Sequence, residues 1–414
     1  MTKINLLPHQ LDAFNRTKNR QRVAYYLDMG LGKTFLGSYK LEQINTPYNI
    51  LVCQKSKIED WIEHFETFHD LTVIDYTKKK IPEITPHSII IINYDLIWRR
   101  PELLKMKDFT LMLDESSYIK NERSKRGKFV LRLKPENVIL LSGTPTGGKY
   151  EELYSQCRLL GWKISKQAFY DNYIVTHKIN ANGFPLEVIT GYKNVNHLKR
   201  KLREYGAVFM KSEDVLTLPE QVETTLKIKR TKEYKQFKKD RIININGVDL
   251  IGDATLTNML HQRQLCGQYN KYKLERLAEL LESTNGRLII FYNFTAEYEA
   301  IKSICDNLGK PVSVVNGAIN DLSAYEQHDN AVTLVQYQAG AMGLNLQKAN
   351  HLVYFTLPLS SELFEQSKKR IHRLGQSKTC FYYYLIVENS IEENINKTLA
   401  KRQDYTNKLF EKGR

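Results

Sequence analysis

The chain has 414 residues, of which 42% are hydrophobic and 26% charged. These are ordinary globular values, which exclude a mainly disordered chain, a collagen-like fibre and a small disulfide scaffold. A single core stops growing at roughly 250–300 residues, so the length predicts two or three domains. The formal net charge of +15 favours a polyanionic partner, although charge alone does not separate nucleic acid from an acidic membrane surface or simple solubility.

The sequence shows no pattern typical of a membrane or exported protein. Its apolar runs are far shorter than the about 20 residues that a membrane helix needs, and Pro8 interrupts the N-terminus before a signal-peptide core forms. The five cysteines are scattered without a C-x-x-C pair, which favours buried reduced thiols over a zinc site or disulfide framework. We therefore expect a cytoplasmic protein of a bacterial or phage-infected cell, without a membrane partner.

Short apolar runs alternate with helix-like segments along the whole chain. The runs that predict buried strands are 23–27, 50–52, 88–92, 110–113 and 138–141 in the first half, and 288–291, 311–315, 332–335, 351–355 and 381–387 in the second. Such alternation predicts an α/β fold with parallel sheets covered by helices, in two tandem domains.

The two predicted domains are residues 1–218 and 219–414. A Lys- and Tyr-rich stretch at about 162–218 has a weak strand signal and is interpreted as a mostly helical appendage of the first domain. Residues 218–220 (Leu-Pro-Glu) are interpreted as the hinge, and 232–281 as a further helical segment before the second sheet.

The first predicted strand runs into a glycine loop, Asp28-Met-Gly-Leu-Gly-Lys-Thr34, and then into a helix. A strand, a glycine loop and a helix N-terminus form a phosphate cradle, because loop N–H groups and the helix dipole both face the anion. We expect Gly30, Gly32 and Lys33 to bind phosphates and Thr34 to ligate magnesium. The strict G-x-x-x-x-G-K-[ST] pattern fails at its first position, so a chance G-K-T at a turn remains an alternative.

An acidic pair follows the predicted strand 110–113. Asp114 is expected to hold magnesium, and Glu115 to orient and deprotonate the attacking water. An isolated acidic pair would more often cap the following helix, but the phosphate loop favours the catalytic interpretation. A third strand ends in Ser142-Gly-Thr144-Pro, whose hydroxyls can reach the phosphate network, or form an ordinary turn.

These ordered blocks resemble those of the Swi/Snf-type DNA translocase ATPases of helicase superfamily two. The resemblance covers roughly residues 6–410, with blocks in family order at 7–10, 28–34, 50–61, 92–95, 113–121, 142–145, 288–294, 338–346, 366–376 and 388–393. It implies two RecA-like P-loop domains that hydrolyse ATP with magnesium in the cleft between two lobes. It also implies that Gln10 recognises adenine and that Ser142, Thr144 and Gly343 couple the lobes.

The block at 366–376 contains Arg-Ile-His-Arg-Leu-Gly-Gln from Arg370 onward. Lys368, Lys369, Arg370 and Arg373 crowd one predicted helix, with the two arginines three residues apart on one face. A solvated basic face is the plainer alternative. The resemblance implies that Arg370 and Arg373 act as arginine fingers that stabilise transition-state charge.

Three departures from the family pattern stand out. Ser117 replaces the usual histidine after the acidic pair, residues 146–149 (Thr-Gly-Gly-Lys) replace polar residues with an asparagine, and 210–214 lack the usual paired arginines. The change at Ser117 weakens the expected coupling between hydrolysis and the second lobe, but it does not weaken magnesium binding. Ser117 and Gly147-Gly148 keep a scaffold with weak ATPase open as an alternative.

Basic clusters recur along the chain, and each alone is more often a solvated face. With the resemblance they favour a channel that binds nucleic-acid phosphates without sequence preference. The expected backbone contacts lie in loops after strands: Lys55, Ser56, Asn93, Tyr94, Asn293 and Gln338. Phe169, Tyr170 and Tyr173 are the candidates for a strand-separating wedge.

The predicted function is an ATP-dependent motor that translocates on double-stranded DNA. Two alternatives stay open: a helicase or branch-migration enzyme that unwinds forked DNA or RNA, and a nucleic-acid-binding scaffold with weak ATPase that recruits replication or recombination proteins. A P-loop kinase for small molecules does not account for 370–376 and the second sheet. We expect a monomer on duplex or branched DNA, directed by a separate targeting protein.

Overall fold

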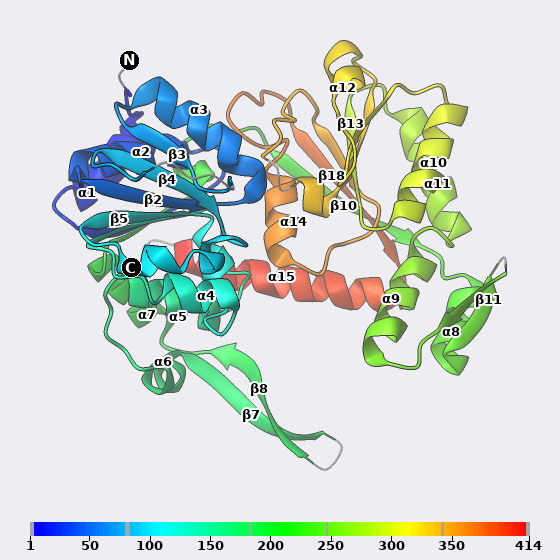
Figure 1. Ribbon diagram of the computed structural model, residues 1–414. Coiled ribbons are helices and arrows are strands. Elements are labelled where there is room, and N and C mark those ends of the chain that lie inside the picture. The colour runs from blue at the N-terminus through cyan, green and yellow to red at the C-terminus, as the bar shows by residue number, and fades with distance from the viewer. Residues whose placement is uncertain (1–3, 79–82, 182–183, 246, 341–342, 411–414) are drawn as a thin grey trace. The chain divides into compact units, whose positions relative to one another are not determined.

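The structure is a computed structural model that describes residues 4–78, 83–181, 184–245, 247–340 and 343–410. The chain divides into two compact units (Figure 1). Unit 1 comprises residues 1–215 and 404–414, and unit 2 comprises residues 216–403. The predicted boundary at 218/219 falls three residues from the observed one. The assignment of 404–414 to the second domain was wrong, because this segment belongs to unit 1.

Unit 1 is built on a seven-stranded sheet in the order β3-β4-β2-β5-β6-β1-β9. All of its neighbouring strands pair in parallel. The strands are β1 (Arg22–Leu27), β2 (Tyr48–Cys53), β3 (Thr72–Asp75), β4 (Ser88–Asn93), β5 (Phe109–Asp114), β6 (Asn137–Ser142) and β9 (Ala207–Met210). The helices are α1 (Pro8–Thr17), α2 (Lys33–Ile44), α3 (Ile58–Phe68), α4 (Lys125–Val130), α5 (Tyr154–Leu159), α6 (Lys166–Tyr173) and α7 (Val195–Glu204).

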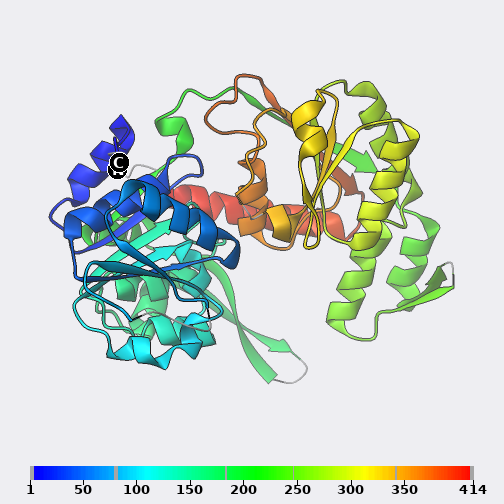
Figure 2. The same ribbon diagram turned by 45° about the horizontal axis from the view of Figure 1, so that its top comes forward.

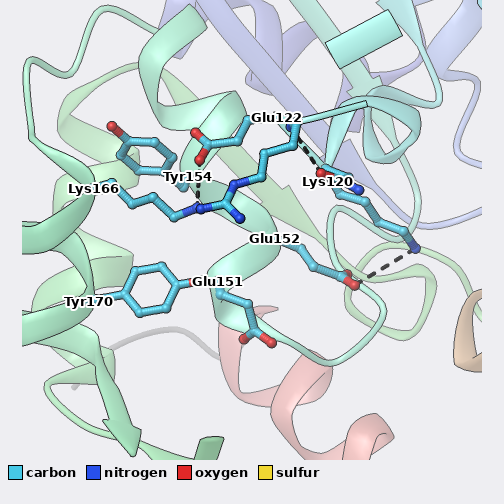
Figure 3. A pocket seen from close by; sticks show the side chains of 9 residues that line it. Lys120, Glu122, Glu151, Glu152, Tyr154, Lys166 and Tyr170 are labelled. Carbon is cyan, nitrogen blue, oxygen red and sulfur yellow. Dashed lines mark hydrogen bonds and ion pairs between the residues drawn. The ribbon is translucent and has the colours of Figure 1, made fainter. Parts of the chain in front are cut away.

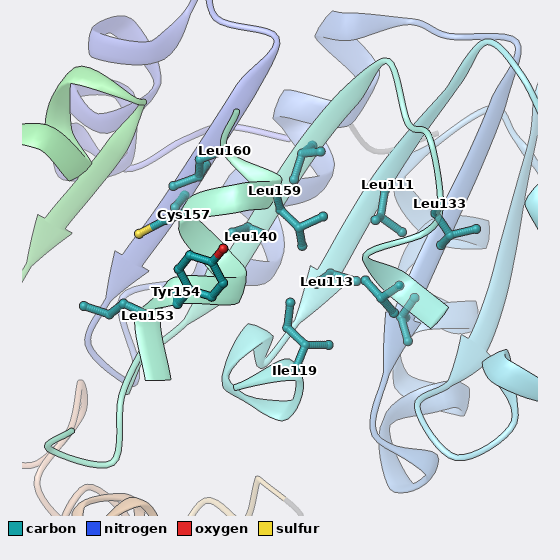
Figure 4. Packing of buried hydrophobic residues seen from close by; sticks show 14 of the residues in the cluster. Leu111, Leu113, Ile119, Leu133, Leu140, Leu153, Tyr154, Cys157, Leu159 and Leu160 are labelled. Atoms are coloured by element: carbon teal, nitrogen blue, oxygen red, sulfur yellow. The ribbon is translucent and has the colours of Figure 1, made fainter. Parts of the chain in front are cut away.

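The core of unit 1 fills the space between this sheet and its helices. Figure 4 shows Tyr154 and Cys157 of α5 beside Leu140 of the sheet, with Leu111 and Leu113 farther along the same cluster, near Leu133 and Ile119. Leu111, Leu113 and Leu140 are completely buried. Each contributes about 1.5–3 kcal/mol of hydrophobic free energy, which explains why continuous apolar runs mark the central parallel strands.

Unit 2 is built on a second seven-stranded sheet, in the order β10-β18-β17-β13-β16-β14-β15. Pairing is parallel except between β14 and the edge strand β15. The strands are β10 (Gln221–Ile228), β13 (Leu288–Tyr292), β14 (Val312–Val315), β15 (Asn320–Asp321), β16 (Val332–Gln336), β17 (His351–Tyr354) and β18 (Cys380–Val387). The helices are α8 (Lys232–Asp240), α9 (Thr255–Cys266), α10 (Lys271–Ser283), α11 (Thr295–Asn307), α12 (Ser323–Gln327), α13 (Tyr337–Gly340), α14 (Ser361–Lys368) and α15 (Ile391–Phe410).

Alternate residues of the central strands of unit 2 enter two different clusters. In β13, Ile290 and Tyr292 join one cluster, while Ile289 and Phe291 join the other. This alternation buries both faces of the sheet, as a parallel sheet with helices on each side requires. The prediction of two α/β domains with parallel sheets is therefore confirmed, and each of the ten predicted runs forms a strand.

The appendage of unit 1 is not mostly helical. Between α6 and α7 the chain forms a long antiparallel hairpin of β7 (Ile174–Ala181) and β8 (Phe184–Tyr192), which extends away from the sheet of unit 1 (Figure 2). The segment 232–281 is likewise interrupted by a hairpin of β11 (Ile242–Ile245) and β12 (Val248–Ile251). Phe169 and Tyr173 are buried in the core of unit 1, so neither is an exposed wedge.

The end of α15 is fixed in unit 1 by aromatic contacts. The backbone carbonyl of Tyr405 accepts a 2.8 Å hydrogen bond from the Tyr150 hydroxyl. The centre of the Tyr405 ring lies 4.7 Å from the centre of the Tyr192 ring. Leu409 and Phe410 are buried there as well. All five cysteines are buried and free, as predicted. Among the helices in the described ranges, none combines the length and the apolar character needed to cross a membrane.

Candidate functional site

The glycine loop between β1 and α2 is shaped for close approach of a ligand. Gly30 and Gly32 have φ angles of 84° and 71°, a region that favours glycine. A Cβ at Gly32 would stand 2.1 Å from the Gln10 amide nitrogen, so a side chain has no room there. Lys33 begins α2, and its ammonium donates a 2.9 Å hydrogen bond to the carbonyl of Leu27. The loop thus closes around the Lys33 ammonium at the carboxyl end of β1.

Gln10 ties α1 to this loop. Its amide nitrogen donates to the carbonyl of Leu31 at 3.0 Å, and its amide oxygen accepts from the Leu7 N–H at 2.9 Å. The side chain is buried. Gln10 therefore lies directly on the glycine loop, where the sequence predicted its nucleotide contact, and its amide supports the loop backbone.

Asp114 ends β5, which is separated from β1 by the single strand β6. Its carboxylate accepts a 2.8 Å hydrogen bond from the indole N–H of Trp61 on α3. Burial raises the pKa of Asp114, and the Trp61 hydrogen bond and the positive charge of Lys33 oppose that rise. The carboxylate is thus within the electrostatic reach of the loop lysine, as a shared cation and phosphate site requires.

Glu115 occupies a strained turn directly after β5. Its φ of 52° lies in the left-handed region, which costs a residue other than glycine about 1–2 kcal/mol. The Tyr94 hydroxyl supports this turn by donating to the Asp114 carbonyl at 2.8 Å. The turn directs the Glu115 carboxylate to Ser142 at the end of β6, whose hydroxyl donates to it at 3.1 Å. Such strain is typical of functional sites.

Gln156 joins three segments of the site, and sequence reasoning missed it. From α5, its amide oxygen accepts from the hydroxyls of Tyr26 at 2.9 Å and Ser116 at 2.8 Å. Its amide nitrogen donates to the carbonyl of Pro145 at 2.7 Å. The side chain is completely buried. Helix α5 also buries the polar Ser155, so no signal in the sequence singles out Gln156.

Ser142 and Thr144 begin the loop after β6. The Thr144 N–H donates to the Ser142 hydroxyl at 3.1 Å, which fixes the turn. The Thr144 hydroxyl oxygen is buried and has no hydrogen-bond partner among the described atoms. Buried hydroxyls without a hydrogen-bond partner are uncommon. The Thr144 hydroxyl is therefore available to a partner that this structure does not contain, such as a ligand.

A second unpredicted support comes from the segment after β9. The N–H and the hydroxyl of Ser212 both donate to one carboxylate oxygen of Asp28, each at 3.2 Å. The hydroxyl also lies 3.3 Å from the carbonyl of Met29. Residues almost two hundred positions apart thereby fix the start of the glycine loop, and no local motif announces such a contact.

In unit 2 the predicted arginine fingers differ from the sequence expectation. Helix α14 ends at Lys368, so Arg370 and Arg373 lie in the turns after it and do not share a helix face. The Arg370 side chain is 2% exposed, whereas Arg373 is half-buried, and burial lowers its pKa. Lys368 is neutralised by Glu223 at 2.7 Å. Gly343 has a φ of 78°.

The predicted nucleic-acid residues divide into an exposed group and a buried group. Lys55, Ser56 and Gln338 are exposed. Asn93 and Tyr94 are buried beside the acidic pair, and the Asn293 amide is held at 2.8 Å by the Thr356 hydroxyl. The exposed three are free to meet a ligand, while the buried Asn93 and Tyr94 and the half-buried Asn293 support the strand ends on which they lie.

A pocket of about 500 Å³ opens beside the segment after the acidic pair (Figure 3). Its charges are largely paired within the protein: Lys166 contacts Glu122 at 2.6 Å and Lys120 contacts Glu152 at 3.9 Å. Glu152 also accepts from the Gly147 N–H at 2.7 Å. These ion pairs connect the segments after β5 and β6, so the pocket belongs to the framework of the site.

A phosphate loop and an acidic pair on strands β1 and β5, at the same edge of a parallel sheet, define a P-loop nucleotide-binding domain. The family profile described as SNF2-related domain matches residues 26–271, and that described as Helicase conserved C-terminal domain matches residues 272–375. The first match alone covers more than half of the chain. The chain belongs to the SNF2-related family.

Several curated proteins are similar to this chain over most of its length. The putative ATP-dependent helicase/translocase YwqA of Bacillus subtilis is 24% identical, over 93% of this chain and 46% of the relative. The SWI/SNF-related matrix-associated actin-dependent regulator of chromatin subfamily A-like protein 1 of Xenopus tropicalis is 24% identical, over 94% of this chain and 43% of the relative. The chain thus spans less than half the length of these relatives.

Among solved structures, the Sulfolobus solfataricus SWI2/SNF2 ATPase core in complex with dsDNA is similar at 21% sequence identity. The similarity covers 98% of this chain and 93% of that chain, with a TM-score of 0.48.

Proposed function

We propose that this protein is an ATP- and magnesium-dependent motor that translocates on double-stranded DNA. The observation that carries the proposal is the site in unit 1. There the glycine loop, the acidic pair and Ser142 meet at one edge of a parallel sheet, and Ser142 already contacts Glu115. Membership of the SNF2-related family and the net charge of +15 support it.

The residues present fit a nucleotide with magnesium. Gly30, Gly32 and Lys33 would hold the phosphates through loop N–H groups and the ammonium. Thr34 and Asp114 offer the hydroxyl and carboxylate oxygens that magnesium prefers. When bound, magnesium would offset phosphate charge. The Gln10 amide, which lies on the loop, would recognise adenine.

Glu115 is the proposed general base. It would orient a water molecule and accept its proton, and the Ser142 hydroxyl would hold the carboxylate in place. Arg370 and Arg373 of unit 2 are proposed to stabilise the charge that develops on the transferred phosphate. Ser142, Thr144 and Gly343 are proposed to couple nucleotide state to movement.

The DNA contacts proposed for the motor are phosphate contacts. Lys55, Ser56 and Gln338 are exposed and follow strands, so they can reach a backbone without reading bases. A relative is named helicase/translocase, which agrees with movement along nucleic acid. Asn93, Tyr94 and Asn293 would then act by positioning these loops.

One observation favours the helicase or branch-migration alternative. The β7–β8 hairpin carries Ile179 and Leu186, which face each other across the strands and are 48% and 53% exposed. An exposed apolar pair on a ribbon can serve as a wedge between bases. The scaffold alternative instead requires that Lys33→Ala leave the biological function intact.

Displacement of a third strand from duplex DNA separates these functions. A translocase removes a triplex-forming oligonucleotide from blunt duplex in the presence of ATP without separating the duplex strands. We expect this result, and we expect it to vanish in Lys33→Ala. Separation of a forked duplex without triplex displacement would favour the helicase, and binding without either activity would favour the scaffold.

A further inference from the structure

A second pocket of unit 1 lies beside the edge strand β9 and has a volume of about 370 Å³. It is formed by the end of α1, the turn after it, the end of α7 and β9. The residues that line it are Arg16, Thr17, Arg20, Arg203, Gly206, Ala207, Val208 and Phe209. Three of these eight are arginines, and no aspartate or glutamate lines the pocket among the described residues.

One of the arginines is held by a neutral partner that leaves its charge uncompensated, and another is paired with a carboxylate on its own helix. Arg20 donates a 2.7 Å hydrogen bond to the backbone carbonyl of Glu204, which is a neutral partner. Arg16 contacts Asp12 on its own helix at 2.6 Å, at an exposed position. The Glu204 carboxylate is itself engaged by Lys201 at 2.7 Å.

The third arginine combines charge with an aromatic surface. The Arg203 guanidinium lies over the ring of Phe209, 5.8 Å from its centre. Burial lowers the pKa of Arg203, and the positive charge of Arg16 lowers it further. Arg16 and Arg203 both line the pocket, so an anion bound there would interact favourably with both guanidinium groups.

We propose that this pocket binds a phosphate group carried on a nucleotide-sized ligand. Guanidinium groups donate paired N–H bonds that match phosphate oxygens, and three arginines line this pocket. A volume of about 370 Å³ lies within the range of small-molecule sites, so it admits more than a lone phosphate. The half-buried Phe209 ring offers an apolar face to the remainder of the ligand.

This site is separate from the glycine loop, and the inference does not depend on the proposed motor function. Arg20 precedes β1 and the loop follows it. The six residues of β1, at about 3.3 Å each, place about 20 Å between the two. The two sites could therefore each hold a ligand at the same time.

Calorimetric titration of the full chain with inorganic pyrophosphate tests the proposal. The glycine loop is itself proposed to bind phosphates, so the wild type should show two binding events. In Arg203→Gln the affinity of the arginine-lined pocket for pyrophosphate should fall at least tenfold, so that its binding event is lost from the titration. Arg203→Lys should restore this affinity only in part. The matched control is Arg200→Gln on the same helix, because Arg200 is 69% exposed and does not line the pocket.

Arg16→Gln repeats the test at an exposed position, in case Arg203→Gln fails to fold.

Duplex DNA then distinguishes the source of the phosphate. If DNA is the ligand, Arg16→Gln should reduce the slope of log K against log salt by about 0.9. An unchanged slope with loss of pyrophosphate binding identifies a free phosphate compound. Titrations and slopes that match the wild type in Arg16→Gln and Arg203→Gln would overturn the proposal.

Discussion

Single buried polar side chains hold the candidate site together. Gln156 satisfies two hydroxyls and one carbonyl from three segments, Tyr26, Ser116 and Pro145. Removing a partner from a buried polar group costs about 1–3 kcal/mol, whereas water would satisfy the same group at the surface. The amide is therefore expected to position the turn around Glu115 without touching a ligand.

Replacement of Gln156 by Leu should lower both stability and turnover. We expect a loss of about 2–4 kcal/mol in the free energy of unfolding, because three buried groups lose their partner. The rate constant kcat should fall at least tenfold with a smaller change in KM, since the substrate-binding residues remain. Urea unfolding and steady-state ATP hydrolysis measure the two effects.

The matched control is Gln167→Leu, in an exposed pair with Asp171 on α6. It should change neither quantity. A Gln156→Leu variant that melts like the wild type and keeps its kcat would show that this network does not position the site.

Glu297 predicts a pH dependence in unit 2. It is completely buried, and burial raises its pKa to about 7. Between its unfolded pKa of about 4.3 and this value the folded state binds more protons than the unfolded state. The free energy of unfolding should therefore fall as pH rises through this window, by about 4 kcal/mol from this group.

Glu297→Gln should remove that contribution. The glutamine oxygen can still accept from the N–H groups of Asn293 and Phe294, which the carboxylate does now at 2.8 and 3.2 Å. Urea unfolding at pH 4.5, 6 and 8 gives the difference between variant and wild type. The free energy of unfolding of the variant, relative to that of the wild type, should increase from pH 4.5 to pH 8. A relative value that does not change with pH would contradict the raised pKa of Glu297.

At the scale of elements, burial decides which strands could be predicted from sequence. The ten strands that were predicted contain apolar runs because both faces of the sheet are covered. Strand β10 lies at an edge, and its residues alternate between exposed and half-buried, so its polar sequence gave no strand signal. The β7–β8 hairpin has the same exposed character.

The site follows a similar division. The residues within each motif are neighbours in sequence, as at 28–34, 114–115 and 142–144, so each motif could be recognised from its spacing. The adjacent parallel strands β5, β6 and β1 then bring the three motifs to one edge of the sheet. Gln156 and Ser212 reach the site only through tertiary packing. Helix α14 likewise ends at Lys368 because turns follow it, whereas the helical spacing of the basic residues predicted a helix that continued through Arg373.

The exposed β7–β8 hairpin is predicted to be dispensable for folding. Deleting residues 178–187 and joining Asn-Gly between His177 and Val188 preserves their observed cross-strand pairing. The root of the hairpin is fixed separately, because Tyr192 stacks on Tyr150 at 4.4 Å. The shortened protein should melt within a few degrees of the wild type.

Tyr192→Ala is the contrasting variant and should lower the melting temperature more than the deletion does. The opposite result would be a shortened protein that does not fold while Tyr192→Ala melts at the temperature of the wild type. That result would show that the hairpin strands contribute to the core. In the forked-DNA assay the same deletion tests the wedge role of Ile179 and Leu186.

At the scale of the whole molecule, the chain carries a candidate nucleotide site in unit 1 and a second parallel-sheet unit that matches the helicase C-terminal profile. It passes between the units twice, at 215/216 and at 403/404. The positive charge of +15 spans both units and suits a partner that is bound through phosphates. The proposed motor would hydrolyse ATP to an extent that depends on the nucleic acid it follows.

ATP hydrolysis without nucleic acid, and with duplex DNA, single-stranded DNA or RNA, is the most direct test of this account. We predict strong stimulation by duplex DNA that weakens with added salt, as phosphate contacts require. Glu115→Gln should abolish it, by at least a hundredfold in rate, while ATP binding persists. Equal rates in every condition, or stimulation that survives Glu115→Gln, would contradict the proposed motor.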